Sequence, residues 1–281
     1  MNSDSLLNSA AASNFAAAPL PLIIGHRGAS SVAPENTLAA FERALDDGAD
    51  GVEFDVRLAR DGVPVVIHDA TLERTGLLRG VAVSELSSSE LGEVDAGTWF
   101  NLRFPEAAWE SYARERIPTL ARTFELIGAR SRFVYVEMKC EDGDDYAPLA
   151  AAVVGLIREH ELVGRAVVKC FAHEAIREVK RLAPEIRTAA LFDRKLSRPF
   201  VTTRRIIAQA LACGADEISL HRSLVRRRVV EAARGHGVET LVWTVDTPSW
   251  VGRARRLGLR AIFTNRPAEM LGALDSLRTS I

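Results

Sequence analysis

Cysteine is scarce in this chain and forms no recognisable pattern. The 281 residues contain three cysteines, Cys140, Cys170 and Cys213, which lie far apart and include no CxxC pair. An odd number of widely spaced cysteines argues against a disulfide framework and against a zinc site with cysteine ligands. We therefore expect a protein of a reducing compartment, with a cytoplasmic location.

The chain also lacks a large excess of charge and a long apolar run. Its 36 Lys and Arg oppose 37 Asp and Glu, for a formal net charge of −1, which gives no electrostatic reason to expect nucleic acid or an acidic membrane as partner. No apolar stretch approaches the roughly 20 residues that cross a bilayer, so we expect no integral membrane segment. We interpret the one tight basic run, Arg226-Arg227-Arg228, as a solvated helix end.

The first residues lack basic side chains. Residues 1–20 are rich in Ala, Ser and Asn and contain neither Lys nor Arg. A secretory signal opens with a positively charged region, so this composition does not indicate one. We expect a disordered leader at 1–20, followed by a single barrel domain at 21–281.

Apolar runs alternate with amphipathic stretches along the rest of the chain. Strands are expected at 22–25, 51–57, 132–138, 166–171, 187–191, 217–220, 239–245 and 261–264. Helices are expected at 37–46, 120–127, 148–160, 174–182, 203–213, 223–234, 248–257 and 267–277. Eight strands that each precede a helix are typical of an α/β protein with a (β/α)₈ TIM barrel. A doubly wound open sheet is the main alternative, but the GxGxxG turn typical of it is absent from the sequence.

The second unit of this pattern departs from the repeat. Asp61-Gly62 predicts a tight turn, and residues 63–68 a return strand that pairs with 51–57. Residues 70–117 contain few long apolar runs, which predicts a small inserted subdomain after the second strand. An insertion at the C-terminal end of a barrel strand usually caps the active site.

Carboxylates alternate along two of the predicted strands. Glu53 and Asp55 lie two residues apart, so their side chains point to the same side of the strand. Glu137 has a similar place near the end of the third strand. Three carboxylates at one barrel mouth repel one another unless a cation lies among them, and all-oxygen ligation favours Mg²⁺ or Ca²⁺ over zinc. The alternative is a charged layer in which they pair with Arg57, Arg27 and Lys139.

Two histidines end neighbouring strands beside this cluster. His26 and His68 titrate near neutrality, so one can accept a proton from a nucleophile while the other donates to a leaving group. Arg27 offers a planar fork suited to phosphate oxygens, and Lys139 adds a point charge. Such a set is expected for phosphoryl transfer on a diester, although a histidine taken alone is more often structural.

Three further features near strand ends are less specific. Trp243 fills either the core or the wall of a pocket for a small polyol. His221 follows a strand, and whether it faces the site stays open. The turn Thr264-Asn265-Arg266-Pro267 is assigned a structural role first, as the start of the last helix.

Together these motifs resemble the glycerophosphodiester phosphodiesterase family over residues 22–277. The resemblance is carried by Gly25-His26-Arg27-Gly28, Pro34-Glu35-Asn36-Thr37, Glu53-x-Asp55, His68-Asp69, Asp95-Ala96-Gly97-x-Trp99-Phe100, Glu137-x-Lys139, Trp243-Thr244-Val245 and Thr264-Asn265-x-Pro267. It implies a barrel with a small inserted domain. It also implies hydrolysis of glycerophosphodiesters, such as glycerophosphocholine or glycerophosphoethanolamine, to sn-glycerol 3-phosphate and an alcohol.

The resemblance also implies roles for individual residues. The ligands of one divalent cation are Glu53, Asp55 and Glu137, and the acid/base pair is His26 and His68. The phosphate is held by Arg27 and Lys139, and a substrate wall is formed by Trp243. The implied route begins with attack of the glycerol 2-hydroxyl on phosphorus, and water then opens the resulting cyclic phosphate. The chain departs from the family pattern at Arg74-Thr75-Gly76 and at Cys170-Phe171.

Two other functions stay open at this point. One is a lysophospholipase D or phospholipase C-like hydrolase of a lipid phosphodiester, which needs an apolar channel walled by Trp99, Phe100, Phe104 and Trp109. The other is a non-catalytic barrel that binds a phosphate ligand or a partner protein. The full set of two histidines and three carboxylates argues against the second, because a binding module needs no proton-transfer pair. The oligomeric state has no signal in the sequence.

Overall fold

The structure, a computed structural model, describes residues 19–140, 144–194 and 201–279. Apart from Pro19 and Leu20, the expected leader lies outside these residues. The strands of the described part are β1 (Leu22–His26), β2 (Gly51–Leu58), β3 (Pro64–Val66), β4 (Phe133–Met138), β5 (Ala166–Cys170), β6 (Arg187–Phe192), β7 (Glu217–His221), β8 (Glu239–Trp243) and β9 (Ala261–Thr264).

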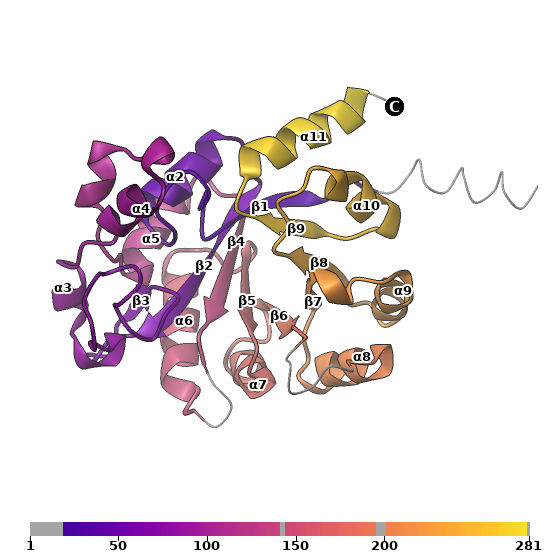
Figure 1. Cartoon of the computed structure of the whole chain (residues 1–281). Coiled ribbons are helices and arrows are strands. Elements are labelled where there is room, and N and C mark those ends of the chain that lie inside the picture. The colour runs from indigo at the N-terminus through magenta and orange to yellow at the C-terminus, as the bar shows by residue number, and fades with distance from the viewer. Residues whose placement is uncertain (1–18, 141–143, 195–200, 280–281) are drawn as a thin grey trace, which may run out of the picture.

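Eight of these strands form a closed parallel barrel (Figure 1). They are hydrogen-bonded in the order β1, β9, β8, β7, β6, β5, β4 and β2, and pairing of β2 with β1 closes the ring. β3 is antiparallel to β2 and lies outside the barrel. The predicted (β/α)₈ architecture and the return strand after β2 are therefore confirmed.

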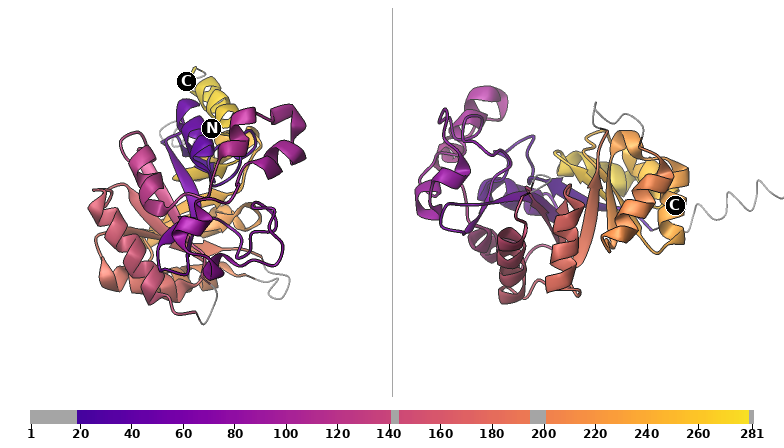
Figure 2. Two further views of the ribbon diagram at one scale, coloured as in Figure 1. Left: turned by 90° about the vertical axis from the view of Figure 1, so that its left-hand side faces the viewer. Right: turned by 90° about the horizontal axis from the view of Figure 1, so that it is seen from below.

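Helices surround the barrel (Figure 2). They are α2 (Leu38–Asp46), α5 (Leu120–Ile127), α6 (Ala147–Glu159), α7 (His173–Leu182), α8 (Thr203–Ala212), α9 (Arg227–Gly235), α10 (Ser249–Leu257) and α11 (Pro267–Thr279). None of the helices in residues 19–140, 144–194 and 201–279 combines the length and the hydropathy needed to cross a bilayer.

The main core lies between the barrel and its helices. On β2, Val52, Phe54 and Val56 belong to this core. The Phe54 ring lies 5.3 Å from that of Phe41 on α2 and 6.2 Å from that of Phe124 on α5. Burial of each such side chain contributes about 1.5–3 kcal/mol. The apolar face of β2 therefore packs against helices, and the opposite face points into the barrel, as the alternation predicts.

Polar residues mark where several helices begin. The Thr37 side chain accepts a hydrogen bond from the backbone of Ala40, and Thr119 does the same for Arg122 at the start of α5. Such N-caps stabilise a helix by about 1 kcal/mol each. Thr37 of the Pro34–Thr37 motif is thus a helix cap, and Glu35 and Asn36 contact residues of the barrel mouth.

The expected helix at 223–234 begins four residues later. Residues Arg222–Leu224 form a 3₁₀ turn, η4, and Val225 and Arg226 are extended, so α9 starts at Arg227. Arg226 and its two following arginines are exposed, which confirms the solvated helix end. The strand expected to reach residue 245 ends at Trp243.

Short elements occupy the segment between β3 and α5. They are η1 (Val83–Glu85), α3 (Ser88–Leu91), α4 (Thr98–Arg103), η2 (Pro105–Ala107) and η3 (Glu110–Arg114). In Figures 1 and 2, α3 and α4 lie on the opposite side of the molecule from α8 and α9. Two small apolar clusters hold these elements together, one around Leu72 and Leu91 and one around Phe100 and Tyr112.

Candidate active site

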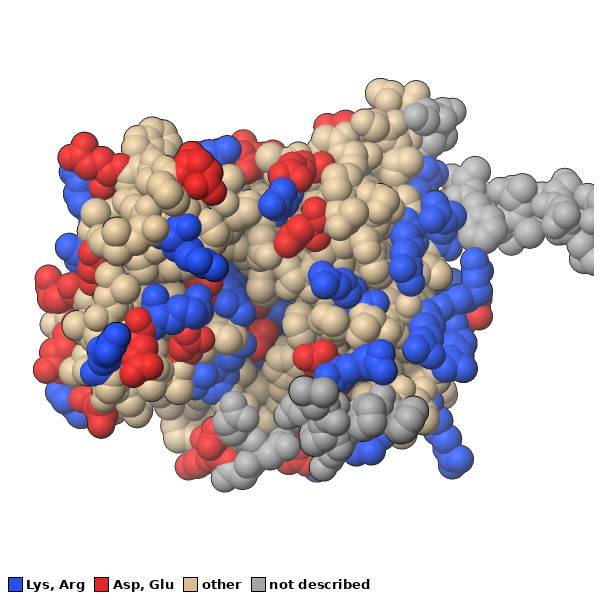
Figure 3. All heavy atoms as spheres, in the orientation of Figure 1, with Lys and Arg blue, Asp and Glu red and all other residues tan. Residues whose placement is uncertain are grey.

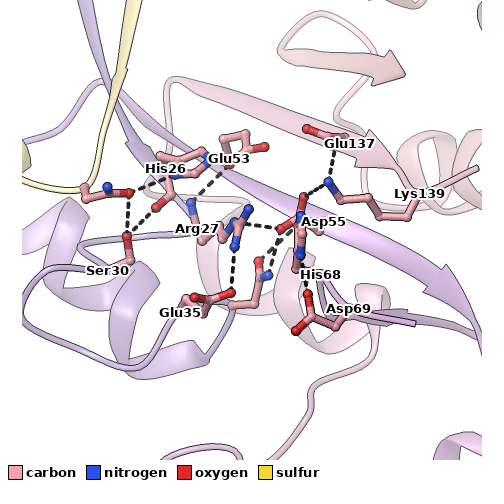
Figure 4. A network of polar contacts seen from close by, with 12 residues as sticks. His26, Arg27, Ser30, Glu35, Glu53, Asp55, His68, Asp69, Glu137 and Lys139 are labelled. Carbon is pink, nitrogen blue, oxygen red and sulfur yellow. Dashed lines mark hydrogen bonds and ion pairs between the residues drawn. The ribbon is translucent and has the colours of Figure 1, made fainter. Parts of the chain in front are cut away.

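The strand register brings the predicted site residues together. His26 on β1 lies opposite Glu53 on β2, and Asp55 lies opposite Glu137 on β4. His26 ends β1 and Glu137 is the last residue but one of β4, and the register sets Glu53 and Asp55 of β2 level with them. This is the face where barrel enzymes carry their active sites. Residues as much as 111 positions apart in the chain thus meet at one barrel mouth (Figure 4).

Three buried carboxylates form a cluster at this mouth. Glu53, Asp55 and Glu137 are 0%, 1% and 5% exposed. One carboxylate oxygen of each lies within 4.8 Å of the other two. Three hard oxygen donors at this separation suit Mg²⁺ or Ca²⁺.

Three cations face these carboxylates. Lys139 Nζ lies 2.9 Å from Asp55 Oδ1 and also contacts Glu137, and Arg27 Nε lies 3.0 Å from Asp55 Oδ2. Lys169 Nζ lies 2.8 Å from Glu53 Oε1 and 3.4 Å from Glu137 Oε2. Three negative and three positive groups leave the cluster with no formal net charge.

Lys169 was not among the predicted site residues. It lies on β5 directly opposite Glu137, and its side chain is only 2% exposed. The signal that could have found it is a single lysine inside the apolar run Ala166–Cys170. An unpaired buried ammonium is very costly, so such a lysine indicates a buried acidic partner.

The donor set fits a divalent cation. Glu53 Oε1 and Asp55 Oδ1 are fully buried and lie close to ammonium groups, yet accept no hydrogen bond of good geometry. Burial opposes ionisation of Asp55, but the charges of Arg27 and Lys139 outweigh it and hold its pKa well below the usual range. Burial likewise opposes ionisation of Glu53, and Lys169 outweighs it to lower the Glu53 pKa. These oxygens are therefore ionised and available to a metal.

His26 is held at the end of β1 by a side chain from the opposite end of the chain. Its Nδ1 lies 2.8 Å from Asn265 Oδ1, and its Nε2 lies 3.9 Å from Glu53 Oε2. Burial lowers the pKa of His26, and nearby Arg27 and Lys169 act in the same direction against Glu53. The imidazole is thus favoured in its neutral form beside the carboxylates.

His68 has a carboxylate partner of its own. Its Nδ1 lies 2.5 Å from Asp69 Oδ1, and Arg74 Nε lies 2.6 Å from Asp69 Oδ2. Partial burial opposes ionisation of Asp69, but the hydrogen bonds from Arg74 and His68 outweigh it and lower its pKa to about 2. The ionised Asp69 accepts a hydrogen bond from Nδ1–H, which leaves Nε2 of His68 free.

Arg27 adopts a left-handed backbone conformation, with φ of 55°. This conformation is uncommon outside glycine, and here it lets the Arg27 N–H donate to Glu53 Oε2 at 3.1 Å. Gly28 follows with φ of 84°, and a Cβ on it would lie 2.5 Å from the Ala40 carbonyl group. The Gly25–Gly28 motif is therefore a turn that only glycine can complete.

A chain of ion pairs joins the two histidine sides of the mouth. Arg27 donates to Glu35 Oε1 at 2.7 Å. Glu35 also accepts two hydrogen bonds of 2.8 Å from Arg74. Arg74 begins the Arg74-Thr75-Gly76 segment, one of the two places where the sequence departs from the motifs described above. Because Arg74 also binds Asp69, it links the partner of His68 to the partner of Arg27.

Trp243, at the end of β8, packs against the rings of His221, at the end of β7, and Phe171, directly after β5. Its ring centroid is 5.3 Å from that of His221 and 5.6 Å from that of Phe171, both edge to face. The Trp243 indole N–H donates to the Ser219 carbonyl at 3.1 Å. Trp243 and His221 therefore lie together, and the polar partners of His221 are Ser223 and Asp193, at 2.8 and 3.6 Å from its Nδ1.

A groove of about 870 Å³ leads from this mouth to the segment after β3. Its lining includes the polar side chains of His26, Arg27, Glu35 and Arg74 and the apolar side chains of Leu77, Trp99, Leu102 and Phe104. Phe100, expected in an apolar channel, is fully buried instead, and Trp109 lies outside the groove lining. Figure 3 shows this side of the molecule hollowed near its middle, with Lys, Arg, Asp and Glu side chains at the edges.

Comparisons with known proteins converge on one family. The profile of the glycerophosphoryl diester phosphodiesterase family matches residues 26–269. A glycerophosphodiester phosphodiesterase of Caldanaerobacter subterraneus is 34% identical over 252 residues, 89% of this chain and 96% of that protein.

Solved structures give the same result. One is a phosphodiesterase of Oleispira antarctica in complex with its product sn-glycerol 3-phosphate, with a TM-score of 0.77 and 28% identity over 91% of this chain and 97% of that one. Another is a glycerophosphodiester phosphodiesterase of Agrobacterium tumefaciens, with a TM-score of 0.73 and 31% identity over 90% of this chain and 100% of that one.

Proposed function

The chain belongs to the glycerophosphoryl diester phosphodiesterase family, and from this we propose that it hydrolyses glycerophosphodiesters to sn-glycerol 3-phosphate and an alcohol. The observation that carries the proposal is the cluster of three buried carboxylates flanked by His26 and His68. A barrel that only bound phosphate would not need two histidines with a free ring nitrogen beside a metal-binding cluster.

We assign the cation to Glu53, Asp55 and Glu137. A bound Mg²⁺ or Ca²⁺ would polarise the phosphorus centre and neutralise charge that develops on its oxygens. The cluster carries no formal net charge without it, so a dication gives the mouth an excess of positive charge for a phosphodiester anion. The cation that we propose for this site is Mg²⁺ or Ca²⁺.

Lys139 and Arg27 are assigned to the phosphate group. In the structure both cations are engaged with Asp55. Once a metal shares the charge of that carboxylate, part of the hydrogen-bonding capacity of the ammonium and the guanidinium becomes available to phosphate oxygens. Trp243 and its neighbouring rings are assigned to the wall against which the substrate packs.

His26 and His68 are assigned to proton transfer. Each uses Nδ1 for a hydrogen bond with a fixed partner, Asn265 or Asp69, so Nε2 of each ring is left for proton transfer. One imidazole removes the proton of the attacking hydroxyl, and the other protonates the departing alcohol oxygen as the P–O bond breaks. In the proposed route the glycerol 2-hydroxyl attacks first, and water then opens the cyclic phosphate.

A product assay tests the function directly. Glycerophosphocholine and glycerophosphoethanolamine are incubated with the protein after EDTA treatment, with no cation, with Mg²⁺ or with Ca²⁺, and sn-glycerol 3-phosphate is measured. We expect product only after a cation is restored. The absence of product under all three conditions with both substrates would contradict the proposal. A substrate analogue without the 2-hydroxyl separates the cyclic-phosphate route from direct attack by water on phosphorus. Without that hydroxyl no cyclic phosphate can form, so only direct attack by water hydrolyses the analogue.

The groove favours a second candidate, hydrolysis of a lysophospholipid-like diester. Leu77 and Leu102 on its lining are 49% and 71% exposed, and Trp99 and Phe104 lie beside them. Small head groups do not need such an apolar strip, whereas an acyl chain does. Activity on lysophosphatidylcholine is compared with that on glycerophosphocholine for the unchanged protein and for Leu102→Asp. If Leu102→Asp loses activity on lysophosphatidylcholine but not on glycerophosphocholine, the result supports this candidate. If Leu102→Asp and the unchanged protein are equally active on the lipid, the result opposes it.

We also propose a cytoplasmic location for the enzyme. The three cysteines are free, two of them buried, which suits a reducing compartment. Non-reducing mass analysis of protein from the native source tests this, since a disulfide between these cysteines would contradict it.

A further inference from the structure

We propose that Asn265, itself held by Asp246, is a positioning residue that fixes the tautomer of His26 so that Nε2 carries the lone pair. From the sequence, the turn that contains Asn265 is assigned a structural role first. The inference rests on the proposed function, because it explains how one member of the proton-transfer pair is prepared.

Asn265 and Asp246 follow neighbouring strands. Asp246 lies three residues after the end of β8, and Asn265 directly follows β9. The Asp246 carboxylate accepts hydrogen bonds from the Asn265 backbone N–H at 2.7 Å and from the Thr264 hydroxyl at 2.9 Å, both on Oδ1. These bonds anchor the Asp246 side chain to the backbone that carries Asn265.

The other oxygen of Asp246 orients the Asn265 amide. Asn265 Nδ2 donates to Asp246 Oδ2 at 2.9 Å. The reversed amide would place two oxygens at that distance, and a carboxylate has no proton to donate. The amide orientation is therefore fixed, and Oδ1 of Asn265 points toward His26.

An amide oxygen can only accept, which determines the protonation of His26. Asn265 Oδ1 lies 2.8 Å from His26 Nδ1, so Nδ1 carries the hydrogen. In a neutral imidazole the second nitrogen is then unprotonated. That nitrogen, Nε2, is the one that lies toward Glu53 and the carboxylate cluster.

Ser30 adds a second link to the same loop. Its hydroxyl lies 2.8 Å from both the His26 carbonyl and Asn265 Oδ1, and its single hydrogen can be donated to one of them at a time. When Ser30 donates to Asn265 Oδ1, that oxygen accepts from both Ser30 and His26, and the Ser30 bond helps to hold the amide oxygen in place.

The test measures the tautomer directly. Protein labelled with ¹⁵N-histidine is examined by long-range ¹H–¹⁵N NMR, with His26 assigned by its absence in His26→Ala. We expect the Nδ1–H form in the unchanged protein. Asn265→Leu should shift His26 toward the Nε2–H form, whereas Asn265→Asp keeps an acceptor at this position and should retain Nδ1–H. Asn101→Leu, the same change away from His26, should leave the signals as they are.

Kinetics show whether the tautomer matters for turnover. We expect Asn265→Leu to lower kcat by about 10-fold or more, which is part of the roughly 10²- to 10⁴-fold that an acid or base contributes, with KM nearly unchanged. Asn265→Asp should retain more kcat than Asn265→Leu. A purely structural role would lower thermal stability and leave the ratio of tautomers and kcat per folded molecule as in the unchanged protein.

The outcomes separate this inference from the proposed function. An Nε2–H signal for His26 in the unchanged protein overturns the inference whatever the activity, even if Asn265→Leu does not fold. An Nδ1–H signal that persists in Asn265→Leu overturns it as well. If the tautomer changes as expected but the unchanged protein yields no product, the positioning holds and the proposed function fails.

Discussion

The Lys169 ammonium lies 2.8 Å from the Glu53 carboxylate, and the two side chains are only 2% and 0% exposed. The same ammonium lies 4.5 Å from the centre of the Phe263 ring, so one of its sides is apolar and the other faces carboxylates. A buried ion pair of this kind contributes little net stability as a pair, but removal of one partner leaves an uncompensated charge.

Replacement of Lys169 tests whether the carboxylates bind a cation. Lys169→Met should lower the free energy of unfolding by about 3–5 kcal/mol, the usual cost of breaking a buried pair. Saturating Mg²⁺ or Ca²⁺ should reduce this loss, because a bound cation restores the missing positive charge. Urea unfolding with and without the cation measures both values. A loss of the same size in both conditions would contradict a metal site at these carboxylates.

The metal ligands can be tested without any substrate. A ligand that binds only the folded state raises its stability, so added Mg²⁺ or Ca²⁺ should raise the Tm of the unchanged protein. Glu137→Gln should lose most of that rise, since an amide is a poorer ligand for a hard cation.

Glu217→Gln is the matched control for this change. Glu217 is a fully buried carboxylate at the opposite end of the barrel, paired with Arg187 and Arg260. It should keep the rise in Tm with the cation. Equal loss in the two variants would mean that the cation binds elsewhere.

The two histidines of the mouth should be far more sensitive than the others. His26→Ala and His68→Ala should each lower kcat by at least about 10²-fold, since each removes a proton-transfer group. His236→Ala, at an exposed helix end, should have no such effect. Steady-state kinetics on glycerophosphocholine with saturating cation measure this. Wild-type turnover in either mouth variant would remove that histidine from the mechanism.

The predicted part of the site followed from strand alternation and strand order. Glu53 and Asp55 share a face because the strand period is two, and their pairing with the C-terminal ends of β1 and β4 puts them at the mouth. His26 ends β1, the strand that precedes β2 in the chain. The barrel closes by pairing of β1 with β2, and this pairing sets His26 opposite Glu53. Local pattern and fold class together sufficed for these positions.

The missed residues depend on register and loop contacts that local pattern does not contain. Lys169 matters because β5 pairs with β4 in a register that sets it against Glu137; a shift by one residue would turn it toward the helices. Asn265 reaches His26 across 239 positions in the chain, and Arg74 reaches Glu35 across 39. These contacts are specified by loop conformation, which has no periodic signal.

The Asp69–Arg74 contact predicts a pH dependence of stability. The pKa of Asp69 in the folded protein is about 2, below its ordinary value of 3.8. A carboxylate with a depressed pKa stabilises the folded state fully above its unfolded pKa, and this contribution falls as the pH falls toward the folded value. The stabilisation from Asp69 should therefore be complete near pH 6 and partly lost at pH 3.

Urea unfolding of the unchanged protein, Asp69→Asn and Arg74→Met at pH 6 and pH 3 measures this effect. The stability gap between the unchanged protein and Asp69→Asn should shrink at pH 3, because protons compete with Arg74 and His68 for the carboxylate only in the unchanged protein. Arg74→Met removes the strongest partner of Asp69. The difference in stability between the unchanged protein and Arg74→Met should therefore also be smaller at pH 3 than at pH 6. Side chains of both residues are partly exposed, and added salt should weaken the effect by screening. A gap that stays constant or widens between pH 6 and pH 3 would exclude Asp69 as an ionised partner of His68.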